Sequence, residues 1–137
     1  NMTEKELCRL AIKAMERAYV PYSGYRVGAA LLTTGGKVFT GCNIENASYT
    51  PTVCAERTAV FKAVSEGHTS FEMIAVAGGK GGKITGAFPP CGVCRQVLAE
   101  FCAPDFPVLL VTGDDSFEKL TLDGLLPRAF YPSYIEL

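Results

Sequence analysis

The sequence predicts a layered α/β domain in which helices cover a mostly buried β-sheet. The chain has 137 residues, a length that favours one domain built around one hydrophobic core. Segments with helical spacing of apolar residues alternate along it with short apolar runs typical of strands. It shows neither an internal repeat nor a linker, so we expect a single domain.

The first half of the chain predicts one helix followed by a hairpin. Apolar residues recur at helical spacing from Thr3 to Ala18, and Thr3 and Glu6 match the pattern of a capping box. Val27–Thr33 and Lys37–Cys42 have the composition of strands. The glycine pair between these two segments predicts a hairpin turn.

The second half continues the alternation of helices and strands. Its predicted elements are, in chain order, a helix from about Val53 to Glu66, a strand over Phe71–Ala77, a helix from near Cys91 to about Phe101, a buried strand over Pro107–Thr112, and a short helical turn over Leu122–Leu125. The rest of the C-terminal region is predicted to be an extended tail.

A glycine-rich stretch, Gly78 to Gly86, contains Gly-Lys pairs that invite comparison with phosphate-binding loops. Ala77 stands where that motif has its first glycine, and Ile84 follows Lys83 where the motif has Ser or Thr. We therefore interpret the stretch as a mobile loop without a phosphate site.

Charge and composition argue against nucleic acid polymers and membranes as partners and in favour of other copies of the chain. Lys and Arg number 13 against 14 Asp and Glu, whereas nucleic acid polymers are bound by strongly basic surfaces. No apolar run approaches the roughly 18 residues of a membrane span, and no signal-peptide pattern is present, so we expect a cytoplasmic protein. Hydrophobic residues make up 48% of the chain, which suggests that some surface is buried against other copies.

Two cysteine motifs predict a metal site. Cys91 and Cys94 are three residues apart at a predicted helix start, so both sulfurs can reach one ion. Cys54 lies at the start of the preceding predicted helix, where the helix dipole favours the thiolate. In a reducing compartment such cysteines indicate metal binding, and three sulfur ligands favour zinc, one ion per chain.

The residues beside these ligands predict catalysis. Three protein ligands leave zinc one open position, which catalytic sites use for water. Glu56, two residues after Cys54, is the natural proton carrier for that water. Three thiolates give the site a formal negative charge that a neighbouring guanidinium could offset. Arg57 and Arg95 both flank ligands, and we favour Arg57 because it shares a turn with Cys54 and Glu56.

These motifs resemble those of the short zinc-dependent cytidine deaminases. A Cys two residues before Glu, followed later by Pro-Cys-x-x-Cys, is the zinc-deaminase signature, and the Cys-Asn-Ile-Glu-Asn run narrows it to the cytidine branch. Similar runs over Val27–Leu32, Gly41–Ala47 and Leu125–Pro127 extend the resemblance over nearly the whole chain. It implies a single three-layer domain over residues 2–137, with a mixed β-sheet flanked by helices.

The resemblance also implies an activity. The expected reaction is hydrolytic deamination of free cytidine and 2′-deoxycytidine to the uridine products, with release of ammonia, as in pyrimidine salvage. Zinc-bound hydroxide would attack C4 of the ring while Glu56 shuttles the protons. The implied partners are a small nucleoside and other copies of the chain, in a homotetramer with shared active sites. A nucleic acid polymer or a membrane is not expected.

Individual positions acquire roles through the same resemblance. Asn43 and Glu45 match residues that hold the ribose, and the Ala55 backbone N–H matches a group that reads the pyrimidine edge together with Glu56. Three aromatic positions are implied to line the substrate site, the last two at places shared between subunits: Tyr25, Tyr49 and Phe130. Two departures from the family pattern are Tyr25, which replaces a Phe, and Pro89, which replaces a frequent Ser.

Two other functions fit parts of the pattern. A deaminase of a cytosine-containing antibiotic nucleoside, of the blasticidin S type, would share the zinc motifs, but the Asn43–Asn46 run speaks against it. A non-catalytic module stabilised by zinc would need a fourth ligand, for which Cys42 is the candidate. The placement of Glu56 beside an open zinc position speaks against that reading.

Overall fold

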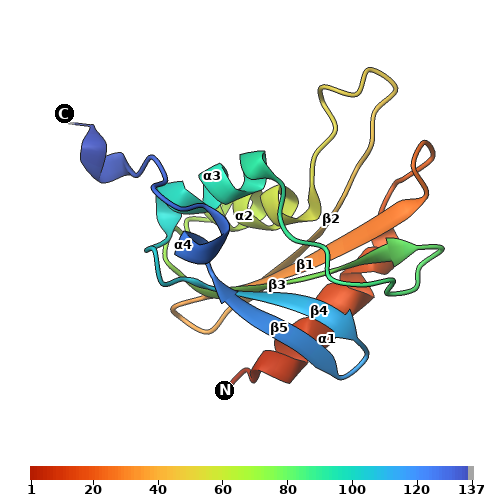
Figure 1. Ribbon diagram of the computed structural model, residues 1–137, viewed down its shortest axis with the longest axis horizontal. Coiled ribbons are helices and arrows are strands. Elements are labelled where there is room, and N and C mark those ends of the chain that lie inside the picture. Colours follow the sequence, from red (N-terminus) through yellow and green to blue (C-terminus); the bar gives the residue numbers. More distant parts are fainter. Residues whose placement is uncertain (136–137) are drawn as a thin grey trace.

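The computed structural model describes residues 1–135, and a five-stranded β-sheet forms its centre (Figure 1). The strands lie in the order β2-β1-β3-β4-β5, with bounds β1 Tyr25–Thr33, β2 Val38–Cys42, β3 Phe71–Lys80, β4 Pro107–Gly113 and β5 Ser116–Thr121. β3 and β4 are parallel and the other neighbours are antiparallel, which confirms the predicted mixed sheet. The predicted domain extends to Leu137, and its last two residues lie outside those that the structure describes.

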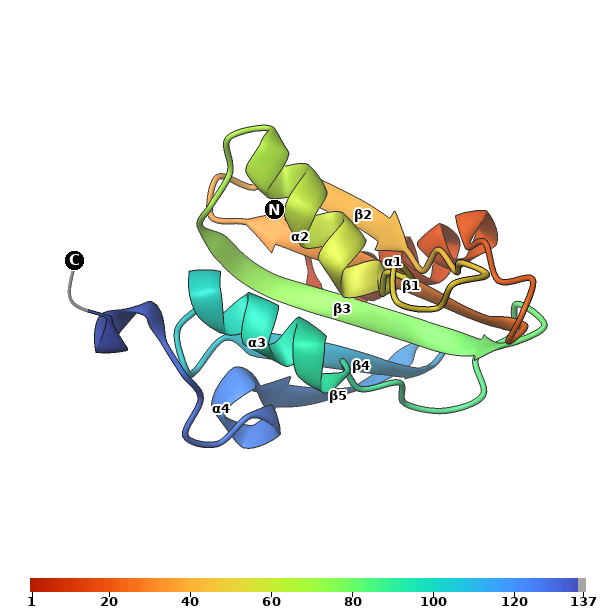
Figure 2. The same cartoon turned by 90° about the horizontal axis from the view of Figure 1, so that it is seen from above.

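Helices cover both faces of this sheet and make the predicted three layers. α1 (Glu4–Ala14) lies on one face, whereas α2 (Ala55–Ser65), α3 (Gly92–Phe101) and the short α4 (Leu122–Leu125) lie on the other (Figure 2). Alternate residues of β1 serve the two layers, because side chains of a strand point to opposite faces. Ala29 and Leu31 pack towards α2 and α3, while Ala30 and Leu32 pack towards α1.

Short-range signals locate the helix starts. Thr3 caps α1, and the reciprocal hydrogen bonds between Thr3 and Glu6 form the predicted capping box. The first helix ends as a 3-10 turn over Met15–Arg17. Cys54 and Cys91 are the N-cap residues of α2 and α3. These two helices lie side by side with their N-termini at the same end of the sheet (Figure 2), so the two cysteine motifs are brought together.

Two strand assignments differ from the prediction. β3 continues through Gly78 and Gly79 to Lys80, and these residues pair with β1, so the predicted loop is wrong for its first three residues. β5 is not among the predicted strands. It is an edge strand in which only Phe117 and Leu120 are partly buried, so it lacks a regular apolar alternation. Within the described part of the chain, no helix is long and apolar enough to cross a membrane.

Candidate active site

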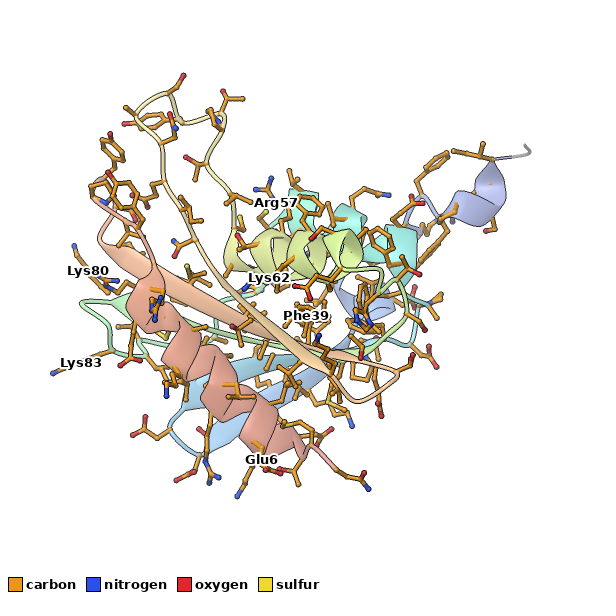
Figure 3. The ribbon with its side chains drawn as sticks, turned by 180° about the vertical axis from the view of Figure 1, so that it is seen from behind. Glu6, Phe39, Arg57, Lys62, Lys80 and Lys83 are labelled. Atoms are coloured by element: carbon orange, nitrogen blue, oxygen red, sulfur yellow. The ribbon has the colours of Figure 1, made fainter. Side chains whose placement is uncertain are left out.

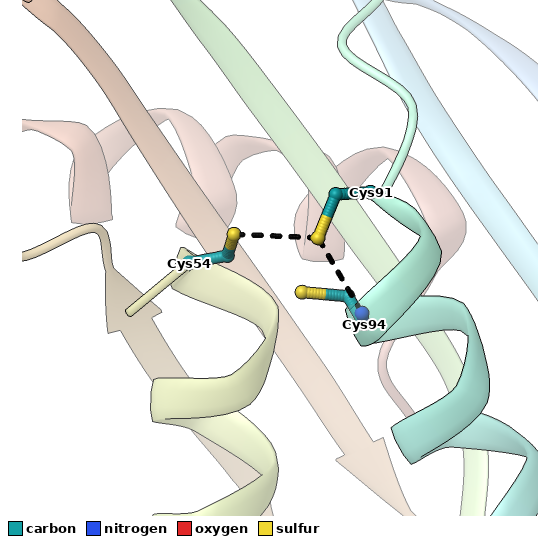
Figure 4. A group of neighbouring side chains, drawn as sticks. All are labelled: Cys54, Cys91 and Cys94. Atoms are coloured by element: carbon teal, nitrogen blue, oxygen red, sulfur yellow. Dashed lines mark hydrogen bonds between the residues drawn. The ribbon is translucent and has the colours of Figure 1, made fainter. Parts of the chain in front are cut away.

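Three cysteine sulfurs meet where α2 and α3 begin (Figure 4). The Sγ atoms of Cys54, Cys91 and Cys94 all lie within 4.8 Å of one another, and those of Cys54 and Cys91 are 3.6 Å apart. Among the described residues, no other His, Cys, Asp or Glu joins this group, and Cys42 does not. The cluster therefore offers three sulfur ligands to one metal ion.

The surroundings of the cluster favour the ionised form of the Cys54 sulfur. The hydrogen bond from Cys94 and those from Arg57 and Cys91 lower the pKa of the Cys54 thiol to about 5, against the opposing effect of burial. The same Cys94–Cys54 bond, together with burial, raises the pKa of Cys94. The backbone N–H of Cys94 donates to Cys91 Sγ over 3.5 Å. Zinc suits this donor set, and its binding would release the remaining thiol protons.

Arg57 is the arginine that reaches the sulfur cluster. It extends from the first turn of α2 (Figure 3), and its Nη2 donates to Cys54 Sγ over 3.5 Å. Arg95, the alternative considered from the sequence, has other partners. Its Nε donates to the Pro90 carbonyl over 2.7 Å, and its Nη1 donates to the Leu125 carbonyl. Arg57 is therefore placed to draw negative charge from a ligand sulfur.

Glu56 is a buried carboxyl beside the cluster. Its residue surface is only 3% exposed, and Oε1 has no hydrogen-bond partner among the described residues. Burial raises the pKa of this carboxyl to about 7, helped by the nearby charge of Cys54. An unpartnered buried oxygen is costly to folding, which indicates that it serves a ligand. A pKa near neutrality suits a group that both accepts and donates protons.

A pocket of about 210 Å³ opens onto this group. Five of the predicted site residues line it: Asn43, Cys54, Ala55, Glu56 and Cys91. Its other lining residues are Val27, Thr52, Val53, Phe88 and Pro89. None of these five was among the site residues predicted from the sequence, although Pro89 was noted as a departure from the family pattern. They carry no metal-ligand spacing or ionisable group, so no sequence signal marks them.

The comparison with known proteins agrees with this geometry. Residues 2–110 match the family described as the cytidine and deoxycytidylate deaminase zinc-binding region. The chain belongs to the cytidine deaminase family.

Individual relatives cover almost the whole chain. A cytidine deaminase of Sporosarcina psychrophila is 50% identical over 94% of this chain and 92% of its own. One from Halalkalibacterium halodurans is also 50% identical, over 94% of this chain and 95% of its own. The crystal structure of cytidine deaminase from Burkholderia pseudomallei superposes with a TM-score of 0.86 at 46% identity, covering 94% of this chain and all of that one.

Family membership and the sulfur cluster together identify the cofactor. The matched region is a zinc-binding one, and it contains the three cysteines that converge at the helix starts. The protein is a zinc-dependent deaminase with one zinc site per chain. The three sulfurs and the unpartnered Glu56 oxygen are the features of this chain that fit the ion and its reaction.

The two residues that the sequence predicts to bind the ribose both hold the segment around the start of β1. Asn43 Oδ1 accepts from the Val27 N–H, and its Nδ2 donates to the Tyr25 carbonyl, both over 2.9 Å. Glu45 accepts from the backbone N–H groups of Tyr22 and Ser23, over 3.0 and 3.1 Å, and from the Ser23 hydroxyl. An amide and a carboxylate retain capacity for further hydrogen bonds, so these contacts leave room for a sugar hydroxyl.

Glu45 and Tyr49 line a second cavity, of about 390 Å³, which shares Thr52 with the pocket. Tyr49 lies edge-on to Tyr22 there, with ring centroids 6.2 Å apart. Because Thr52 lines both, the second cavity lies next to the pocket that holds the cysteines.

The two remaining aromatic residues lie at different distances from the pocket. Tyr25 is 42% exposed and does not line the pocket, but its ring centroid is 6.0 Å from that of the pocket residue Phe88. Phe130 is 58% exposed and does not line the pocket of its own chain. It stacks on Tyr134 at 5.7 Å, in the C-terminal segment that projects from the body of the molecule (Figure 1).

Proposed function

We propose that this deaminase hydrolyses free cytidine and 2′-deoxycytidine to uridine and 2′-deoxyuridine, with release of ammonia. The observation that carries the proposal is Glu56, a buried carboxyl with an unpartnered oxygen, directly beside three converging sulfurs in a small pocket. The names of the relatives, cytidine deaminases at 50% identity, support the same substrate class.

In the proposed reaction, the three sulfurs hold the metal and Glu56 transfers the protons. Cys54, Cys91 and Cys94 would hold the zinc, which would supply the Lewis acidity that makes a water molecule easier to deprotonate. Glu56 accepts the water proton at its carboxylate and delivers it to N3, while the water oxygen bonds to C4. Glu56 then accepts the proton of the new C4 hydroxyl and gives it to the amino group. The C4–N bond breaks as the C4 carbonyl forms, and ammonia leaves.

Backbone groups orient the base for this sequence of steps. Ala55 is the first residue of α2, so its N–H has no acceptor within the helix and is available to the pyrimidine edge. Pro89 lines the pocket and provides a carbonyl that can accept from the departing amine. That role needs no side chain, which explains how a proline can replace the family's frequent serine.

The direct test is to incubate the zinc-loaded protein with cytidine and to measure uridine and ammonia together. We expect stoichiometric release of both. Glu56→Gln should retain the zinc content of the parent protein and lose turnover by about 10²-fold or more, because proton transfer is removed and the sulfur ligands are kept. If the zinc-loaded parent protein showed no turnover, the alternative function, a non-catalytic module stabilised by zinc, would be favoured. If the variant lost its zinc, Glu56 would be a metal ligand.

We also propose a homotetramer in the cytoplasm. Several large apolar side chains are exposed on one chain, among them Tyr49, Phe61, Phe130 and Tyr134, which supports burial against further copies. All six cysteines are free thiols, and three of them are needed unoxidised at the site. A reducing compartment keeps them in that form.

A further inference from the structure

Phe88 is a pocket residue whose position depends on a glycine of β3. A Cβ atom on Gly78 would lie 2.6 Å from Phe88 Cγ and 2.7 Å from its Cδ2. These atoms are close to the root of the side chain, so the ring could not avoid a methyl group by a small movement of its tip. The absence of a side chain at Gly78 therefore allows the Phe88 ring to rest directly on the sheet.

The glycine-rich stretch shapes this seat. A Cβ on Gly79 would lie 1.6 Å from the Lys83 carbonyl oxygen, so the turn after β3 can fold back only over a glycine. The Thr85 N–H returns to donate to the Gly78 carbonyl over 3.3 Å. The chain then reaches Phe88 three residues later. This glycine-rich stretch, interpreted from its sequence as a mobile loop, leads directly to an aromatic ring at the pocket.

Tyr25 confines the ring from another direction. The two rings are tilted by 38° with centroids 6.0 Å apart, and Lys80 Nζ lies 5.5 Å from the centroid of the Tyr25 ring. Lys80 extends from the far end of β3 on the same side as the glycine-rich turn (Figure 3). Phe88 thus has Gly78 on one side and Tyr25 on another, and it forms a defined wall of the pocket.

The direction of the base follows from the chemistry. Residues of two segments next to the sulfurs line the pocket: Cys54–Glu56 at the start of α2, and Phe88, Pro89 and Cys91 before α3 (Figure 4 shows the two helix starts). N3 must face Glu56 to receive its proton. C5 lies on the other side of C4 from N3, so the C5 edge of the ring faces the segment that carries Phe88.

We propose that Phe88, seated on Gly78, is the specificity-determining wall that excludes substituents at C5 of the cytosine ring. The inference rests on the proposed function, because it uses cytidine as the substrate. One extra methyl group in a close-fitting apolar pocket changes kcat/KM by about 10- to 200-fold. The parent enzyme should therefore favour cytidine over 5-methylcytidine within that range.

The test compares kcat/KM for 5-methylcytidine and cytidine in several variants. Phe88→Val should raise the ratio by about tenfold or more, and Phe88→Leu should raise it less, because leucine fills more of the space. Gly78→Ala should lower kcat/KM for cytidine by about tenfold through displacement of the ring. The double variant Gly78→Ala/Phe88→Val should regain part of that loss, since the smaller valine clears the new methyl. Gly35→Ala, at a distant open turn, is the matched control and should leave the ratio unchanged.

A binding measurement separates this inference from the proposed function. Titration calorimetry with uridine and 5-methyluridine should show the same discrimination in the parent protein and its loss in Phe88→Val, without any turnover. The proposed role of Phe88 would be refuted if the parent enzyme had equal kcat/KM for cytidine and 5-methylcytidine. It would also be refuted if neither Phe88 variant changed the ratio of the two values. If the parent protein bound uridine more tightly than 5-methyluridine but did not deaminate cytidine, the proposed activity would be refuted and the proposed role of Phe88 would be retained.

Discussion

Arg57 lies on the same helix as Glu56 and contacts a sulfur of the metal site. Its Nη2 donates to Cys54 Sγ, while its Nε is buried without a partner among the described residues. Three thiolates around a divalent ion leave one negative charge, and a hydrogen-bonded guanidinium reduces the electron density that the sulfurs place on the metal. The contact is local, because Cys54 and Arg57 are three residues apart across the start of α2.

Arg57→Gln should weaken zinc binding by about 10- to 100-fold, because a charge-assisted hydrogen bond to a ligand is lost. Competition with a chromophoric chelator measures the affinity directly. Arg57→Lys keeps the cation but not the forked geometry, so it should recover part of the affinity. Arg9→Gln removes an exposed cation far from the sulfurs and serves as the control. Unchanged zinc affinity in Arg57→Gln would assign the compensation to backbone N–H groups instead.

The sugar gives a second prediction at this scale. Asn43 lines the pocket and Glu45 the adjoining cavity, and the two are matched to ribose binding. We expect them to hold the 3′-hydroxyl, so cytidine and 2′-deoxycytidine should show similar kcat/KM, and 3′-deoxycytidine and cytosine should be poor. Cytidine 5′-monophosphate should also be poor, because Glu45 adds negative charge. Efficient turnover of cytosine or of the 5′-monophosphate would remove both residues from the site.

Residues of the site differ in how far sequence alone could predict them. Cys54, Glu56, Cys91 and Cys94 lie in the first turns or caps of two helices, so their chemistry follows from spacings of two or three residues. Phe88 has no such signal. Its place in the pocket depends on Gly78, ten residues earlier on a strand, and on the path of the turn between them.

At the scale of elements, two glycines set how closely helices approach the sheet. Gly28 of β1 faces α1, where a Cβ would lie 2.1 Å from the Ala11 carbonyl oxygen. Gly41 of β2 faces α2, where a Cβ would lie 2.5 Å from both the Ala55 carbonyl oxygen and the Ala59 nitrogen. Both contacts are with helix backbone, which cannot move without shifting the whole helix. Of these two helices, α2 carries residues of the candidate active site and α1 does not.

The two alanine substitutions should therefore separate stability from function. Gly28→Ala and Gly41→Ala should each lower the free energy of unfolding by about 1–3 kcal/mol through overpacking. Gly41→Ala should in addition lower zinc affinity and kcat, because displacement of α2 moves Cys54 and Glu56. Denaturant titration and chelator competition on both proteins make the comparison, with Gly35→Ala as the open-turn reference. Equal zinc affinity in the two variants would contradict the link between α2 and the site.

Elements with a buried face were predictable, and those without one were not. α1 and the strands β1 and β4 carry clear apolar patterns because each faces a core. β5 has one exposed face and a free edge, so its polar residues resemble a tail. The end of β3 is glycine-rich because it must accommodate Phe88 and the returning turn, and this local requirement hides its strand character.

For the whole molecule, the position of Phe130 is the main feature that one chain cannot explain. The Phe130 carbonyl accepts from Gln96 Nε2 of α3 over 2.8 Å, which anchors the segment, while its ring remains exposed. A large exposed aromatic ring on an anchored segment is suited to contact with another molecule. Its match to an aromatic residue at a shared site makes a second copy of this chain the expected partner.

Mixing two inactive chains can test whether sites are shared. Glu56→Gln removes the proton carrier but keeps the Phe130 ring. Phe130→Ala removes that ring but keeps Glu56. If Phe130 completes a neighbour's pocket, assemblies formed by refolding the two variants together should contain pockets with an intact Glu56 and a donated Phe130. Activity should then rise well above the sum of the separate proteins. A mixture of Phe130→Ala with the double variant Glu56→Gln/Phe130→Ala should show no gain, because neither chain can donate the ring. Full activity of Phe130→Ala alone, or no recovery in mixtures shown by mass spectrometry to be hybrid, would contradict a shared site.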